Sequence, residues 1–174
     1  MILDIARMML FPALIAFVAA SDLFTMTISN RISLALVAGF LVLAPFSGMG
    51  LYDFLMHLAA GATVLTVAFA CFAIGQVGGG DAKIASCVAL WFGFGHIMDF
   101  LLFASLFGGA LTLLVLYFRQ WPLPYALTGQ DWLLRLHDKR NKIPYGLALA
   151  FGALMIYPET DWTKAVDLTH LAMR

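Results

Sequence analysis

Two aspartates are the residues of this chain whose surroundings suggest chemistry. Asp22 directly follows the first long apolar run, and Asp81 ends the sequence Gly78-Gly79-Gly80-Asp81 just ahead of another apolar run. Most of the other acids fall in stretches that read as connections between such runs. An ionisable group beside a segment that belongs in hydrocarbon is costly to keep there, so it is a candidate functional residue by default.

A pair of aspartates is suited to the hydrolysis of a peptide bond. Two carboxylates held close together cannot both ionise easily, so they share a proton. One can take a proton from water while the other protonates the departing amide, without a metal ion or a nucleophilic side chain. Glycines at Gly78 and Gly80 would let an extended substrate strand approach Asp81. The alternative is that the glycines form only a flexible turn and that each aspartate is an interfacial cap or a mark of topology.

Other chemistries have little support in the sequence. The histidines are scattered without an HExxH pattern, and Cys71 and Cys87 are too far apart for a zinc knuckle, so no metal and no cofactor are expected. The triple glycine is not followed by the Lys-Ser/Thr of a phosphate loop. Ser21 has no His and Asp partners in its local sequence that would make a hydrolase triad.

Composition identifies a membrane protein. Of the 174 residues, 63% are hydrophobic and only 11% are charged, whereas soluble domains carry roughly 25% charged residues. The ten basic residues are balanced by ten acidic ones, so there is no basic field of the kind that binds nucleic acid. The lipid bilayer is therefore an expected partner, and nucleic acid is not.

The apolar runs predict six transmembrane helices in one domain, residues 1–174. Hydrophobicity is continuous along each run, which favours helices over the strands of a barrel. The approximate spans are 5–20, 32–46, 54–74, 84–98, 101–118 and 143–157, some of them short enough to need shielding by neighbouring helices. The predicted fold is an all-α polytopic bundle, with a tight hairpin at Asp99 and Phe100 between the fourth and fifth helices.

The first run also has features of a secretory signal peptide. Arg7 lies near the start of the run, and the small residues Ala19 and Ala20 lie near its end. Because Asp4 weakens the basic region and five further spans follow, we interpret the run as a retained helix.

Basic residues set the expected orientation. If the helices alternate, seven basic residues fall on one side and three on the other, and the richer side faces the cytoplasm. The seven are Arg31, Lys83, Arg119, Arg135, Lys139, Arg140 and Lys142, and the three are Arg7, Lys164 and Arg174. Both termini then lie outside the cytoplasmic (inner) membrane, and Asp22 and Asp81 reach the same cytoplasmic face.

Two segments outside the spans read as surface structure. Residues 131–140 mix Trp and Leu with basic residues, and could lie flat on the anionic inner leaflet or contact substrate. The polar tail, residues 158–174, has apolar residues at helical spacing and is expected to form a second surface helix.

Three motifs resemble those of the type IV prepilin peptidases, the membrane GxGD aspartic proteases that remove leader peptides from pilin precursors. The run from Gly78 to Ile84 resembles the GxGD-x-K-hydrophobic signature, and Asp22 is followed by Ile28-Ser29-Asn30 where the family has a hydrophobic-Pro-Asn step. Ile143-Pro144-Tyr145-Gly146 resembles the Pro-Tyr-Gly start of the family's late helix. The motifs occur in the family's order and span most of the chain.

The resemblance implies a substrate and residue roles. The substrate would be a small prepilin or pre-Flp pilin with a short, basic, glycine-ended leader, cleaved on the cytoplasmic side by Asp22 and Asp81. Asn30 would support the loop after Asp22, and Lys83 would either bias the ionisation of the pair or serve as a positive-inside anchor. Ser29 replaces the usual proline, so a less rigid turn is expected there. Pro144, Tyr145 and Gly146 are expected to be mainly structural.

The resemblance also indicates a branch of the family. The sequence has no paired CxxC motifs, which accompany N-methyltransferase activity in the long bifunctional members. We therefore expect peptidase activity alone, as in the short branch that serves Flp-type pili of tight-adherence systems or in the archaeal preflagellin and prepilin peptidases.

Two other functions stay open at this stage. A proton- or cation-coupled transporter would use Asp22 and Asp81 to bind ions, but would place them near the middle of the membrane. A non-enzymatic membrane subunit of a pilus machine would not need the carboxylates at all. The oligomeric state, the pilin substrate and the cleaved bond are not predictable from the sequence.

Overall fold

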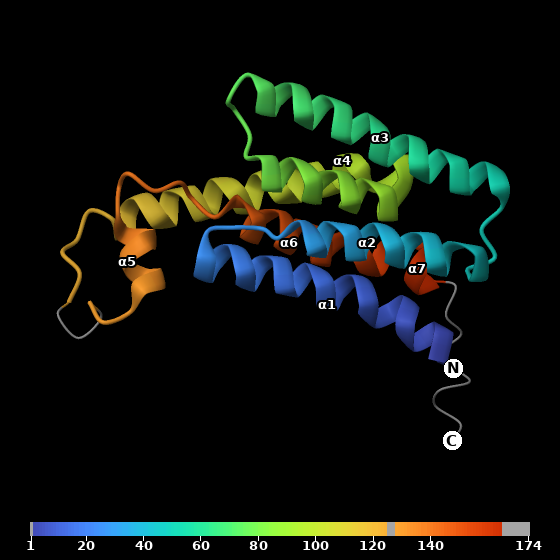
Figure 1. Cartoon of the computed structure of the whole chain (residues 1–174), viewed down its shortest axis with the longest axis horizontal. Coiled ribbons are helices and arrows are strands. Elements are labelled where there is room, and N and C mark those ends of the chain that lie inside the picture. Colours follow the sequence, from blue (N-terminus) through green and yellow to red (C-terminus); the bar gives the residue numbers. More distant parts are fainter. Residues whose placement is uncertain (1, 125–127, 165–174) are drawn as a thin grey trace.

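The computed structural model is an assembly of α-helices (Figure 1). It describes residues 2–124 and 128–164, and these ranges contain no β-strand. The elements in chain order are α1 (Ile2–Thr25), α2 (Asn30–Leu43), η1 (Ala44–Phe46), α3 (Leu51–Ala73), α4 (Gly79–Phe118), α5 (Asp131–His137), α6 (Tyr145–Ile156), η3 (Tyr157–Glu159) and α7 (Asp161–Lys164). The all-helical expectation is confirmed.

Three helices are long and apolar enough to cross a membrane. They are Leu3–Thr25, Leu51–Ala73 and Gly79–Phe118, and a shorter apolar helical segment covers Asn30–Phe46. These helices support an integral membrane protein. The six-span bundle stays a prediction, because it depends on counting α4 as two spans and on accepting the shorter helices α2 and α6.

The chain reverses direction within α4, at Gly93. This residue has φ 62° and ψ −178°, a conformation that favours glycine because a Cβ would clash with the backbone. Figure 1 shows the two halves of α4 running in opposite directions. The reversal therefore differs from the hairpin expected at Asp99 and Phe100. Those residues lie inside the returning half, where Asp99 is exposed beside His96 and Phe100 is fully buried.

Side chains from other helices satisfy the carbonyl groups that the reversal leaves free. Nδ1 of His57 in α3 lies 2.9 Å from the Leu90 oxygen, and Nε1 of Trp162 donates to the Trp91 oxygen at 2.6 Å. Because a carbonyl can only accept, His57 carries its proton on Nδ1. The two contacts tie α3 and α7 to the end of the outgoing half of α4.

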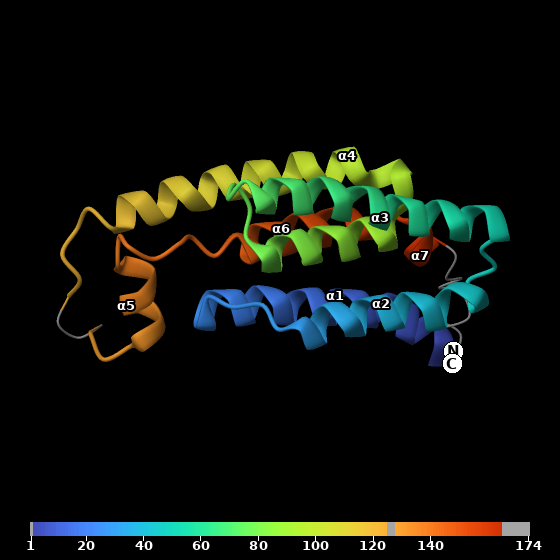
Figure 2. The same ribbon diagram turned by 45° about the horizontal axis from the view of Figure 1, so that its top comes forward.

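The helices pack in two layers. Figure 2 separates α1 and α2 from α3, α4 and α6, and the contacts between the layers run from α1 to α6 and from α2 to α4. An aromatic cluster joins the layers: Phe11 lies 5.1 Å from Trp91 between ring centroids, and Trp91 lies 4.6 Å from Trp162. The indole of Trp91 also donates to the Leu36 oxygen at 2.9 Å.

This arrangement brings three helix ends together at one end of the molecule. The carboxyl end of α1 and the amino ends of α4 and α6 lie toward the same side, and the Gly93 reversal lies toward the other (Figure 1). The two surface segments are shorter than expected in the described residues. Helix α5 ends at His137, and within the tail η3 and α7 reach Lys164, while residues 165–174 lie outside the described ranges.

Candidate active site

Asp22 lies in the last turns of α1 and is bound to the start of α6. Its side chain is buried, with the residue 6% exposed. Oδ2 accepts a hydrogen bond from the Gly146 backbone N–H at 2.7 Å, and the carboxylate also accepts one from the Leu147 N–H. These N–H groups belong to the first turn of α6, whose N-cap residue Pro144 supplies no side-chain cap. Asp22 therefore caps α6 from another helix, at the end where the helix dipole favours negative charge.

Asp81 lies in the first turn of α4, three residues after the N-cap residue Gly78. Its carboxylate accepts a hydrogen bond from the Gly78 backbone N–H, which is the acidic half of a capping box. Asp81 also interacts electrostatically with Asp22 and with Lys142. Each aspartate thus sits at the amino end of a helix, and the two charges are close enough to influence each other.

Ile28 fills the space between the two helix ends. A Cβ built on Gly80 would lie 3.2 Å from Ile28 Cβ, and a Cβ built on Gly146 would lie 2.8 Å from Ile28 Cδ1. The same Cβ on Gly146 would lie 2.8 Å from Asp22 Oδ2. Glycines at both positions let the loop after α1 insert the Ile28 side chain between α4 and α6.

Glycine at position 78 is required by contact rather than by backbone conformation. Gly78 has φ −71°, and the positive φ in this region belongs to Gly75. Gly75 ends α3 in a Schellman arrangement, in which its N–H bonds the Phe72 oxygen and the Gln76 N–H bonds the Cys71 oxygen. A Cβ on Gly78 would lie 2.6 Å from Asp81 Oδ2, so any larger residue there must displace the carboxylate.

Lys83 and Asn30 bind each other. Lys83 Nζ donates to Asn30 Oδ1 at 2.8 Å, which ties the start of α4 to the start of α2. Ser29, at the position of the family's proline, is the N-cap residue of α2 and accepts from the Arg31 N–H at 3.3 Å. Its φ of −70° is one that proline adopts. Ser29 therefore caps α2 at the position where the family has proline, and the less rigid turn stays a prediction.

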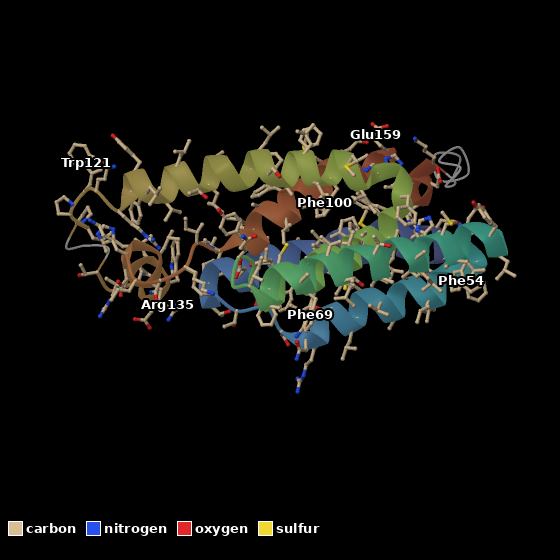
Figure 3. The ribbon with its side chains drawn as sticks, turned by 90° about the horizontal axis from the view of Figure 1, so that it is seen from above. Phe54, Phe69, Phe100, Trp121, Arg135 and Glu159 are labelled. Carbon is tan, nitrogen blue, oxygen red and sulfur yellow. The ribbon has the colours of Figure 1, made fainter. Side chains whose placement is uncertain are left out.

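The cation near Asp81 that the sequence reasoning missed is Lys142. Arg119 folds the connection before it into place: its Nε donates to the Leu136 oxygen at 2.7 Å and its Nη2 to the Asn141 oxygen at 3.2 Å. Arg135 donates to the Phe24 oxygen of α1 at 2.7 Å. Figure 3 shows Arg135 and Trp121 at one end of the molecule and Glu159 at the other. In the sequence, the feature that could have identified Lys142 is its position directly before Ile143-Pro144-Tyr145-Gly146.

A cavity of about 730 Å³ opens beside Asp81. Its lining includes the loop 75–78, the returning half of α4, Lys142 and the start of α6. Asp22 lies behind this lining, buried against α6. The site therefore combines an accessible acid, a second acid held by backbone N–H groups, and room for a ligand.

Metal-ligating groups do not gather in the described residues. No three of their His, Cys, Asp and Glu side chains lie where they could hold one ion.

Comparison with known proteins identifies the family of this chain. No curated protein and no solved structure was found to match this chain. Residues 9–113, which include Asp22 and Asp81, match the model of the type IV leader peptidase family. The match covers more than half of the 174 residues and supports a protease of the type IV leader peptidase kind. The matched residues hold the motifs at Asp22 and at Gly78 to Ile84, whereas Ile143-Pro144-Tyr145-Gly146 lies beyond them. The family resemblance is thereby confirmed, and the chain belongs to the type IV leader peptidase family.

Proposed function

We propose that the protein is an aspartic endopeptidase of the membrane that removes the short basic leader from type IV or Flp-type prepilins. Asp22 and Asp81 are the catalytic pair. Cleavage takes place on the cytoplasmic side, at the end of the molecule where the carboxyl end of α1 meets the amino ends of α4 and α6.

The observation that carries this proposal is that the two aspartates lie near enough for their charges to interact. They are far apart in the sequence, yet their charges interact, and each accepts backbone N–H bonds at the start of a helix. A capping role explains one carboxylate at each helix start, but it does not require the two to be close to each other. Nor does it explain the cavity beside Asp81.

The reaction needs only water and the two carboxyl groups. One carboxylate takes a proton from water as the oxygen attacks the peptide carbonyl, and the other, protonated, gives its proton to the amide nitrogen as the C–N bond breaks. The products are a leader with a new carboxyl end and a mature pilin with a new amino end. Lys142 offsets the negative charge of the pair, and the backbone N–H groups of Gly146 and Leu147 hold Asp22 in one orientation.

Basic residues support the cytoplasmic placement. Lys83 lies near the start of α4, and Arg119, Arg135 and Lys142 lie between the end of α4 and the start of α6. Both regions are at the end of the molecule that carries the site (Figure 1), which is the pattern of a cytoplasmic face. A transporter is disfavoured because both acids lie at helix ends rather than in the middle of a span.

The test is co-expression with a prepilin whose leader removal is read as a mass shift. Asp22→Asn and Asp81→Asn should each abolish leader removal at normal abundance in the membrane. Asp53→Asn and Asp99→Asn are matched controls, because both acids are exposed and belong to the other end of the molecule. Near-normal processing by either active-site variant would refute the pair, and loss of processing in the controls would refute the topology.

A further inference from the structure

The cavity beside Asp81 continues as a groove along the returning half of α4. Five residues of that half line it on one face, at the spacing i, i+3, i+4, i+7 and i+8. They are Leu101, Ala104, Ser105, Gly108 and Gly109. Tyr145 and Leu149 of α6 form one wall, and the loop from Gly75 to Gly78 forms the other.

Packing between helices explains the small size of only some of the α4 residues in this groove. A Cβ on Gly108 would lie 3.1 Å from the Tyr145 ring, and a Cβ on Gly152 would lie 2.8 Å from the Ala104 backbone nitrogen. Ala104 and Gly108 are therefore small because α6 lies against them. Gly109 differs, because a Cβ there would meet no atom within 4 Å. The groove is open at Gly109, and no helix among the described residues fills it.

The floor of the groove is apolar. The hydroxyl of Ser105 donates to the Leu101 oxygen of its own helix at 2.6 Å, so it needs no outside partner. Ser105, Gly109 and Leu101 are exposed, and within a hydrocarbon environment such a surface suits an apolar ligand. Small residues also let another helix backbone approach closely.

The floor runs past Asp81 at the depth where a substrate must lie. Both halves of α4 rise about 1.5 Å per residue on either side of Gly93, so the returning half draws level with Asp81 near Ser105. Relative to Ser105, Leu101 lies about one turn closer to Gly93, and Gly109 lies about one turn closer to the connection that follows α4. A helix that begins at the level of Asp81 would therefore cover Leu101 and Ser105, and the chain ahead of it would pass over Gly109.

We propose that this groove seats the membrane-embedded substrate, an apolar helix that begins beside Asp81 and packs on Leu101 and Ser105. The segment that precedes this helix crosses Gly109. This inference rests on the proposed function, since it takes the cleaved peptide as the occupant. It is argued from the continuity of the groove with the acid and from its apolar, unfilled floor.

The test fills the groove without disturbing the fold. Gly109→Leu places a side chain in open space and improves helix propensity, so the melting temperature should not fall. With a purified prepilin-type peptide, which has a basic glycine-ended leader and an apolar helix, kcat/KM should fall at least about tenfold. Gly95→Leu is the matched control: it also lies in α4 with nothing within 4 Å of its Cβ, but it lines a separate cavity with His57 and Asp161. It should cleave normally.

A binding measurement separates the groove from the catalysis. Photoreactive benzoylphenylalanine in place of Leu101, in an Asp81→Asn background, should crosslink to the apolar segment of the peptide. The same group in place of Leu113, which is exposed on α4 outside the groove, should capture only lipid. If the wild type cleaves the peptide and Gly109→Leu has no effect, or if the probe at Leu101 captures only lipid, the groove is not the substrate site. The proposed function would still stand. Capture of the peptide without wild-type cleavage would uphold the groove and refute the function.

Discussion

Gly146→Ala is the substitution that most sharply separates catalysis from stability. The added Cβ would lie 2.8 Å from Asp22 Oδ2 and 2.8 Å from Ile28 Cδ1, whereas ordinary contacts begin at 3.4 Å. The carboxylate must therefore withdraw by about 0.6 Å or more, which weakens its hydrogen bond to the Gly146 N–H. A displacement of about 1 Å at a reacting group can cost roughly a hundredfold in rate, so we expect a loss of about tenfold to a hundredfold.

Stability should respond much less to this change. Gly146 lies in the first turn of α6 with ordinary helical φ, where alanine normally gains about 0.5–1 kcal/mol over glycine and offsets part of the steric cost. The assay is the time course of leader removal by purified protein, alongside its melting temperature in detergent. Gly95→Ala is the control, because its Cβ meets nothing within 4 Å. Wild-type cleavage by Gly146→Ala, or a loss of activity that only matches a loss of folded protein, would refute the positioning of Asp22 by α6.

Three further sets of substitutions test other parts of the site and the fold. Gly78→Val should cut leader removal by at least about tenfold, and Gly80→Val should do the same because its side chain would meet Ile28. Gly79→Ala should be tolerated, because its Cβ would meet only the Phe72 ring, at 3.3 Å. Equal rates of leader removal in all three variants would contradict the steric argument. Lys142→Met should slow cleavage by roughly threefold to tenfold, since an exposed charge interaction is worth about 1 kcal/mol, and Lys142→Arg should restore it; no rescue would show that charge is not what matters. Gly93→Ala should lower the stability by about 1–2 kcal/mol because of its positive φ, more if His57 cannot move from the 2.9 Å contact, and activity should fall only with the amount of folded protein; an unchanged melting temperature would contradict the account of the reversal.

The sequence predicted the helical class and the two aspartates because both depend on local signals. Continuous apolar runs are visible residue by residue, and Asp22 and Asp81 stand out as acids beside them. The reversal in α4 was harder to predict. Asp99 is the first charged residue after a long apolar stretch, but a helix surface accommodates one exposed acid, whereas only a glycine such as Gly93 readily adopts the backbone conformation of the turn.

The supporting residues of the site depend on contacts that sequence spacing does not reveal. Gly146 is 124 residues from Asp22, and it donates a backbone N–H bond, a group that every residue type except proline carries. Lys83 is close to Asp81 in sequence but bonds Asn30, because on α4 its side chain leaves the helix toward α2. Lys142 lies near enough to Asp81 for an electrostatic interaction because Arg119 and Arg135 hold the preceding connection against α4 and α1.

The most direct test of the central claim is a double-mutant comparison of the two aspartates. Purified wild type, Asp22→Asn, Asp81→Asn and the double variant are compared for single-turnover cleavage of one prepilin-type peptide, with folding checked by melting temperature. If the carboxylates act as one unit, each single change should lower the rate at least about a thousandfold and the double change should be no worse than either. A single variant that retains near-wild-type cleavage, or losses that multiply as for independent groups, would contradict a shared catalytic pair.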